Sequence, residues 1–216
     1  KELDYGAFYD CHSLISITIP VSVKTIGDDA FYNCSSLKKT IYKGNVSDWC
    51  KIKFLSADDS NPVNYSKNLY INDKLVVDLV IPNTVDTINN YVFYGCSSIT
   101  TVTIPESVTY LANNAFERSG LKHITWHPKN YNNGVPGNSS SRSPFYYIKD
   151  SIQSITFGEN VDTIPYRMCW EMYNLKSVSL PDNLKCIEYD AFSACKSLES
   201  VDIPNTVTYI GNYAFN

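Results

Sequence analysis

The chain lacks several features that would indicate particular partners. Its 216 residues carry a net charge of −4, and the 18 Lys and Arg residues form no cluster. Because a protein that binds a phosphate backbone needs a basic stripe, nucleic acid is disfavoured as a partner. No apolar run approaches the roughly 20 residues that span a bilayer, so we expect no membrane insertion in this segment. No apolar stretch follows Lys1 to Asp4 either, and we expect any targeting signal to lie outside the segment.

Residues that carry chemistry are also scarce. The only histidines are His12, His123 and His127, and there is no CxxC, HExxH, P-loop or GxGxxG motif. His12 adjoins Cys11, but neighbours in sequence point in different directions, whereas a Cys–His nucleophile needs a base held beside it. His123 lies on an expected strand, so its spacing from His127 does not make a helical metal-binding face. We therefore expect no enzyme activity, no cofactor and no metal site. An enzyme with a dispersed active site would need a deep cleft that gathers titratable groups.

What the chain does contain is a repeat with a period of 23 residues, as from Pro82 to Pro105 and from Pro181 to Pro204. The shared pattern is P-x-x-V-x-x-I-x-x-x-A-F-x-x-C-x-S-L-x-x-V-x-I. A single coil cannot bury its apolar side alone, so equivalent positions of successive coils stack into a continuous core. The sequence therefore predicts one repeat solenoid over residues 1–216, with coils of about 23 residues.

The end of each repeat alternates apolar and polar residues with a period of two, which favours a short strand with one face inward. We expect one parallel sheet of about eight such strands, and an opposite side that is mostly irregular, with a second extended piece and a single helical turn around the Ala-Phe pair. The expected strands are Leu14–Ile19, Leu37–Tyr42, Val76–Ile81, Ile99–Ile104, Leu121–Trp126, Ile152–Phe157, Leu175–Leu180 and Leu198–Ile203.

Two repeats are longer than the others. The interval between one strand end and the next strand start is 18 residues from Ile19 to Leu37, but 34 from Tyr42 to Val76. The interval from Trp126 to the next strand start, Ile152, is 26 residues. The sequence thus has insertions at about 43–75 and 127–150, and insertions in solenoids usually form surface loops, often on the binding side.

The repeat resembles a known family. AFYNCSSLKK (30–39), AFSACKSLESVDIP (191–204) and VTYIGNYAF (207–215) are similar to the BspA-like class of leucine-rich repeats. SDWCKIKF (47–54) with NLYINDKLVVDLVIP (68–82) resembles an insertion found in bacterial members. The resemblance implies a right-handed leucine-rich-repeat solenoid, usually part of a long secreted or surface-attached protein of host-associated bacteria or parasitic protists. Members are generally described as adhesins or binders of host matrix proteins, and the family has no catalytic residues to carry over.

The chain departs from the family pattern in places. Met168-Cys169 replaces the Ala-Phe pair of one repeat, and Met172 stands where Cys is usual. Both ends of the sequence fall inside a repeat, whereas solenoids need polar caps at their ends. We therefore expect a fragment of a longer array that can self-associate end to end.

The cysteines follow the repeat, which argues against a disulfide framework. Those that lie three residues after the repeated Phe are expected to be small buried hydrophobes, although adjacent coils leave a Cys11–Cys34 bond geometrically open. Cys169 takes a Phe position and is also expected in the core, whereas Cys186 is expected to be an exposed thiol. The cysteines at the repeated position are Cys11, Cys34, Cys96 and Cys195.

Candidate ligand contacts come mainly from aromatic residues rather than from the sheet. The outward positions of the expected strands are mostly Ser and Thr, whereas binding hot spots are usually Trp, Tyr and Arg. Trp49, Phe54, Tyr70 and Trp126 are expected to pack the insertions onto the solenoid. Tyr131 is expected to be the most exposed aromatic of the insertions, and one of the adjacent Tyr146 and Tyr147 should face outward. The candidate contacts are Tyr131, Tyr146, Tyr147, His123, Tyr110 and Tyr209.

Two functions remain open from the sequence. The first is a non-catalytic, extracellular or cell-surface binding module that recognises a host protein or glycan through its insertions and a polar sheet face. The alternative is a structural spacer that presents another domain at the cell surface, for which a regular solenoid with chemically plain faces would suffice.

Overall fold

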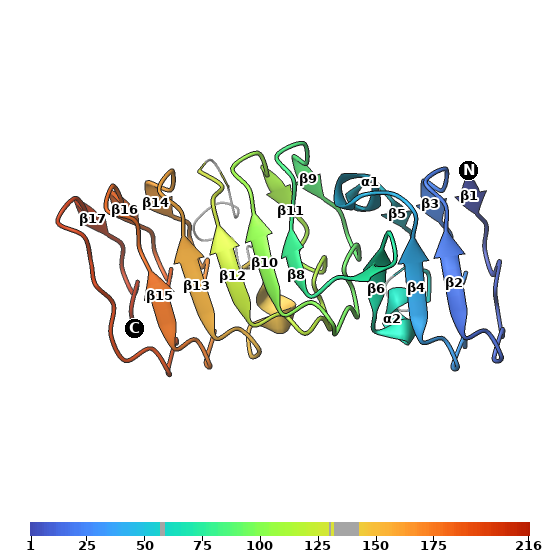
Figure 1. Ribbon diagram of the computed structural model, residues 1–216. Coiled ribbons are helices and arrows are strands. Elements are labelled where there is room, and N and C mark those ends of the chain that lie inside the picture. Colours follow the sequence, from blue (N-terminus) through green and yellow to red (C-terminus); the bar gives the residue numbers. More distant parts are fainter. Residues whose placement is uncertain (57–58, 130, 132–142) are drawn as a thin grey trace.

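In the computed structural model the chain winds into an elongated solenoid, with its first and last coils at opposite ends (Figure 1). The structure describes residues 1–56, 59–129, 131 and 143–216. Each regular coil contributes one strand to a long-strand ladder and one two-residue strand to a short-strand ladder. The repeat solenoid predicted from the 23-residue period is confirmed.

The long-strand ladder runs along one side of the molecule and is parallel except for one hairpin. It consists of two sheets, β2-β4-β6-β7 and β8-β10-β12-β13-β15. The strands are β2 (Ser16–Ile19), β4 (Lys39–Tyr42), β6 (Leu69–Ile71), β7 (Lys74–Leu75), β8 (Asp78–Val80), β10 (Thr101–Ile104), β12 (His123–Trp126), β13 (Ser154–Phe157) and β15 (Ser177–Ser179).

The short-strand ladder is divided into three parallel groups, β1-β3-β5, β9-β11 and β14-β16-β17. Its strands are β1 (Glu2–Leu3), β3 (Thr25–Ile26), β5 (Lys53–Phe54), β9 (Thr87–Ile88), β11 (Tyr110–Leu111), β14 (Thr163–Ile164), β16 (Cys186–Ile187) and β17 (Tyr209–Ile210). These are the second extended pieces expected from the sequence. The two interruptions fall where the two insertions enter the chain.

The sheet differs from the single eight-stranded sheet expected from the sequence. The long-strand ladder is interrupted between β6 and β8, because β7 turns back and pairs antiparallel with β6. The segment 198–203 has the strand pattern but forms no strand, since it makes no ladder hydrogen bonds with β15. Alternation alone therefore predicts where a strand can form but not whether it finds a partner.

The first insertion is a coil of the solenoid rather than the expected surface loop. It contains helix α1 (Val46–Cys50) and helix α2 (Val63–Ser66), which flank β5 in the chain. β5 pairs in parallel with β3, and β6 pairs in parallel with β4, so the insertion extends both ladders. Trp49 of α1 is fully buried and its Nε1 donates to the carbonyl of Val92 at 2.9 Å. The expected packing of Trp49, Phe54 and Trp126 is confirmed, since each is buried.

The second insertion is described only in part, because residues 130 and 132–142 lie outside the described residues. Its last part forms a 3-10 helix, η1 (Tyr146–Ile148). Phe145 is fully buried, and its ring centroid lies 6.2 Å from that of Phe116. Phe145 thus occupies the next position of the aromatic core after Phe116, so this insertion also contributes to the core of the solenoid.

The repeated Phe side chains form a ladder through the core. Ring centroids lie 5.1 Å apart for Phe93 and Phe116 and 5.2 Å apart for Phe192 and Phe215, with nearly parallel planes. The Ala-Phe pairs lie in consecutive turns rather than in the expected helical turn. The reason is that residues two before and two after the Phe are left-handed, as at Asp190 (φ 57°) and Ala194 (φ 61°), which interrupts a right-handed helix.

The cysteines follow the repeat only in part, because Cys11 and Cys195, which were expected to be buried, are half-buried. All seven are free thiols, and Cys34, Cys96 and Cys169 are fully buried. The Cys34 Sγ donates to the Phe8 carbonyl of the preceding coil at 3.2 Å. The expectation of an exposed thiol at Cys186 is wrong, because this side chain is half-buried and burial raises its pKa to about 12.

The inward and outward faces of the long strands are as predicted. Val102, Ile124 and Ile155 are each at most 2% exposed, whereas the Ser and Thr residues beside them are exposed or half-buried. One hydroxyl on the inward side, that of Thr40, is paired with the Ser66 hydroxyl at 2.8 Å. In the described part of the chain, no helix is long and apolar enough to cross a membrane.

Candidate functional site

Two candidate contacts, Tyr110 and Tyr209, occupy the same position of the short-strand ladder. Tyr110 begins β11 and Tyr209 begins β17, and their exposed fractions are 54% and 53%. Their outward orientation is therefore confirmed. They belong to different strand groups, separated by β14 and β16, so the structure does not bring them together.

His123 lies on the outward face of β12, at the start of the strand. Its Nδ1 is 2.8 Å from the Ser154 hydroxyl on the neighbouring strand β13. The ring is exposed, and this cross-strand pair is typical of polar residues on a sheet surface. His127 lies elsewhere, half-buried against Gly158, and the described residues contain no group of three His, Cys, Asp or Glu side chains that could hold a metal ion.

The expectation that Tyr131 is exposed is wrong. Its ring packs edge-on against Trp126 at 4.8 Å between centroids, and its hydroxyl donates to the Leu111 carbonyl at 3.2 Å. Burial raises the pKa of Tyr131. A tyrosine suits this position because its ring packs in the core and its hydroxyl donates to a carbonyl on the edge of β11. This edge does not pair with β14, the next strand of the short-strand ladder. Its role as a ligand contact stays a prediction.

Tyr146 and Tyr147 lie in η1, where only the second ring faces solvent, with 49% of Tyr147 exposed. Tyr146 is half-buried and stacks on Trp170 of the next coil, with centroids 6.0 Å apart and planes at 15°. Lys149 lies over the Tyr146 ring at 4.6 Å and pairs with Glu171.

The Trp170 ring also contacts a cation of its own coil. The Arg167 guanidinium lies 4.5 Å from its ring centroid and forms an ion pair with Asp190 at 3.2 Å. The two cations of this cluster are therefore satisfied within the protein. We interpret the cluster as a clasp between coils, which leaves Tyr147 as its exposed ring.

Three tyrosines that the sequence reasoning missed form the most exposed aromatic group on one edge of the first coils. The exposed fractions are 71% for Tyr5, 47% for Tyr9 and 40% for Tyr32. The rings of Tyr9 and Tyr32 stack with centroids 4.9 Å apart. A signal was present in the sequence, because the residue after the repeated core position is aromatic in several coils, as at Tyr9, Tyr32 and Trp170.

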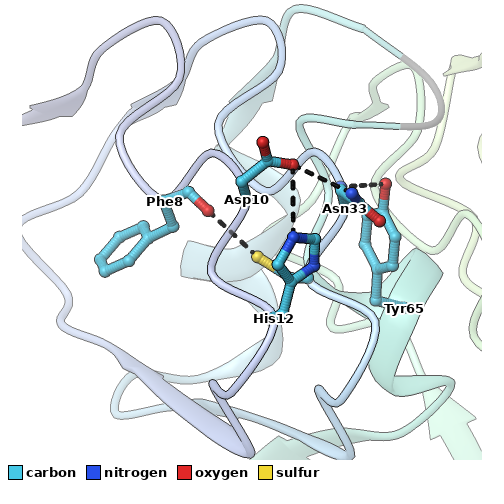
Figure 2. A network of polar contacts seen from close by, with 6 residues as sticks. Phe8, Asp10, His12, Asn33 and Tyr65 are labelled. Atoms are coloured by element: carbon cyan, nitrogen blue, oxygen red, sulfur yellow. Dashed lines mark hydrogen bonds and ion pairs between the residues drawn. The ribbon is translucent and has the colours of Figure 1, made fainter.

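Polar side chains of the same coils form a network of contacts, which Figure 2 shows. The Asn33 amide donates to Asp10 Oδ1 at 2.9 Å, and His12 Nε2 lies 3.8 Å from the same oxygen. The backbone N–H of Asn33 donates to the Tyr65 hydroxyl at 3.0 Å. Burial raises the pKa of Tyr65 to about 12, so this hydroxyl stays protonated and donates to Asp59 at 2.9 Å. We call Tyr5, Tyr9, Tyr32, Asp10, His12 and Asn33 the tyrosine edge.

Cavities lie at the last coil, at the ends of β8 and β10, and between β5 and β9. The first, of about 450 Å³, lies at the last coil beside Phe192, Ile203 and Phe215. The second, of about 430 Å³, lies at the ends of β8 and β10 and includes Glu106 and His127. The third, of about 240 Å³, lies between β5 and β9 and is flanked by Tyr110.

Comparisons with solved structures return other bacterial leucine-rich repeat proteins. A leucine-rich repeat protein from Eubacterium ventriosum is 16% identical, with a TM-score of 0.48, and the match covers 100% of this chain and 79% of that one. A leucine-rich repeat protein from Bacteroides ovatus is 18% identical, with a TM-score of 0.35, over 97% and 78% of the two chains. The pneumococcal vaccine antigen PcpA is 20% identical, with a TM-score of 0.39, over 99% of this chain and 51% of that one.

The chain therefore spans about half the length of the pneumococcal chain. No curated protein matches the sequence. The model of the BspA type leucine rich repeat region matches in 6 copies, over residues 1–76, 63–134 and 138–216. Since these matches cover nearly the whole sequence, the chain belongs to the BspA-type leucine-rich repeat family.

Proposed function

We propose that this chain is a non-catalytic binding module of an extracellular or cell-surface protein, and that it recognises a host protein or glycan. Membership of the BspA-type family supports a repeat module that binds at a surface. The single observation that carries the proposal further is the tyrosine edge, where three tyrosines are each at least 40% exposed.

The chemistry of the tyrosine edge suits recognition better than catalysis. An exposed tyrosine offers a rigid apolar ring and a hydroxyl, and such residues are enriched in binding hot spots. Asp10 follows Tyr9 directly in the chain, and its carboxylate lies 3.8 Å from the imidazole of His12, so both groups can supply polar contacts that fix orientation. Protein side chains and the hydroxyl-rich faces of sugars both fit a surface of this kind.

The proposal is tested by screening the folded chain on arrayed glycans and host matrix proteins. Three variants are screened in parallel: Tyr9→Ala with Tyr32→Ala, Tyr147→Ala alone, and Tyr110→Ala with Tyr209→Ala. We expect a saturable hit that is lost in the first variant and kept in the other two. A hit that survives all three would contradict a tyrosine-based site, and a folded chain without any hit would contradict the binding function.

The spacer function remains the second candidate, and a specific feature favours it. The outward side of the long-strand ladder is largely a row of Ser and Thr. The cations of the clasp around Trp170 are paired with groups of the protein itself. A spacer requires only such a stable, unreactive rod. The absence of any hit in the screen would favour this function.

We also propose that copies of the chain associate end to end. The cavity at the last coil is bordered by apolar side chains that are partly exposed, with 43% of Ile203 and 42% of Phe215 accessible. Apolar surface of this kind is stabilised by a partner. Sedimentation should show concentration-dependent association that Phe215→Asp abolishes, and a monomer at all concentrations would contradict it.

A further inference from the structure

The interruption of the short-strand ladder between β5 and β9 leaves strand edges that face no other strand. The ladder hydrogen bonds of β5 to β3 use the N–H groups of Lys53 and Leu55, which donate to Lys24 and Ile26. Because successive residues of a strand direct their backbone groups to opposite neighbours, the N–H and C=O of Phe54 point toward the interruption. Phe54 is 5% exposed, so these groups have little access to water.

The facing edge of β9 is open in the same way. The carbonyls of Asp86 and Ile88 accept hydrogen bonds from the coil of β11, so the N–H groups of Thr87 and Asn89 point the other way, toward β5. Among the described residues, neither Phe54 nor the N–H groups of Thr87 and Asn89 have a hydrogen-bond partner. Unpaired backbone groups at a strand edge favour pairing with another chain.

At each of the other interruptions of the two ladders, the described chain pairs one of the two facing strand edges. At the break in the long-strand ladder, β7 covers the edge of β6 by antiparallel pairing. At the second break in the short-strand ladder, the Tyr131 hydroxyl donates to the Leu111 carbonyl on the edge of β11. At the β5–β9 break, by contrast, neither facing strand edge has a ladder partner in the described chain.

A cavity of about 240 Å³ lies at this break, bordered by residues from both edges. Leu55 and Tyr110 are each 54% exposed and provide apolar walls, and Lys53 is the charged residue of the lining. Asn89 and Asn90 bring side-chain amides, which can pair with a peptide backbone. We call this cavity, with the edges of β5 and β9, the open slot.

Helix α1 explains why the slot exists. Trp49 of α1 donates to the Val92 carbonyl, and Ser47 of α1 accepts a hydrogen bond from Thr84 at 3.1 Å. These contacts place α1 against the coil that carries β9, in the region between β5 and β9 in Figure 1. The coils are thus joined through the helix rather than through the short-strand ladder.

We propose that the open slot binds an extended peptide segment of a partner protein by strand addition. The peptide backbone pairs with Phe54 on one side and with the N–H groups of Thr87 and Asn89 on the other, while an apolar peptide side chain packs against Leu55 and Tyr110. An acidic residue next to it pairs with Lys53. This site lies apart from the tyrosine edge and goes beyond the proposed function.

The test uses selection of linear twelve-residue peptides from a displayed random library on the folded chain. Peptides that also bind the Leu55→Asp/Tyr110→Ala double variant are removed. We expect enriched sequences with apolar residues at alternate positions, whose addition shifts the backbone amide NMR signals of Phe54, Thr87 and Asn89. Binding should weaken at least about tenfold in Tyr110→Ala and be unchanged in Tyr209→Ala, which alters the same repeat position outside the slot.

The best peptide is then resynthesised with N-methyl groups on alternate backbone amides. Loss of binding in one of the two methylation registers is the result that strand pairing predicts. No enrichment over the double variant, signal shifts confined to other coils, or equal binding by both methylated peptides would overturn the proposal. These outcomes are distinguishable from those of the array screen, because that screen tests the tyrosine edge through the Tyr9→Ala/Tyr32→Ala variant, which leaves the slot intact.

Discussion

At the scale of single residues, a side chain's role here follows from its place in the repeat. The core Phe positions stack from coil to coil, and the cysteine position supplies a small thiol that donates to the preceding coil, as Cys34 does to Phe8. These inward roles could be predicted because the repeat pattern marks them. Tyr131 could not be placed, because its partners, Trp126 and the Leu111 carbonyl, are defined only by the folded chain.

Replacing Phe93 by Ala should lower the free energy of unfolding by about 3–5 kcal/mol, because it removes a fully buried ring that stacks on Phe116. Thr103→Ala on the outward face of β10 should cost less than about 0.5 kcal/mol. Chemical denaturation of both variants tests the assignment of Phe93 to the core and Thr103 to the outward face. Equal losses of unfolding free energy would contradict it.

Stability should also fall at alkaline pH through the buried thiols. Burial raises the pKa of Cys96 from 9.0 to about 11, so the unfolded chain loses this proton before the folded chain does. The contribution is fully present below pH 9 and is lost as the pH rises from 9 to about 11. Thermal melts across this range should show a smaller decline in Cys96→Ala than in the unmodified chain. Identical declines would show that this thiol makes no such contribution.

At the scale of elements, the turns of each regular coil depend on two residues with a left-handed backbone conformation. The residue types at these positions do not reveal that conformation. Among the described residues, glycine occupies such positions at Gly6 and Gly95 alone, while Asp29, Asn33 and Ala194 adopt the same backbone region. A helical turn was expected because the residue types next to the Ala-Phe pair do not indicate that the backbone leaves the right-handed helical conformation. The insertions were misplaced for a related reason, since β5 and β6 join the ladders without the repeat's own residue pattern.

Ala194 provides a direct test of the turn geometry, because its φ of 61° is costly for a residue with a Cβ. Ala194→Gly should raise the free energy of unfolding by up to about 1 kcal/mol, and Ala194→Val should lower it by about 1 kcal/mol or more. Denaturant titration of the two variants measures both changes in the free energy of unfolding. Glycine that destabilises more than valine would contradict a left-handed conformation at this position.

At the scale of the whole molecule, the solenoid is a regular rod, and one of its two candidate sites lies where the regularity is interrupted. The 23-residue period predicted the architecture, the direction of the strands and the buried face. It did not predict the open slot, because the slot depends on how two particular coils meet, where α1 separates β5 from β9. Recognition by this scaffold is therefore expected at the tyrosine edge and the open slot rather than along its sheet.

Amide hydrogen exchange of the unbound chain, followed residue by residue by NMR, tests this account most directly. The amide of Leu55, which donates to Ile26 within the ladder, should be strongly protected, as should that of Ala112, which donates to Ile88. The amides of Thr87 and Asn89 should exchange much faster, because they face the open slot. Rapid exchange at Leu55 would contradict the insertion as a coil of the solenoid, and slow exchange at Thr87 and Asn89 would contradict the open slot.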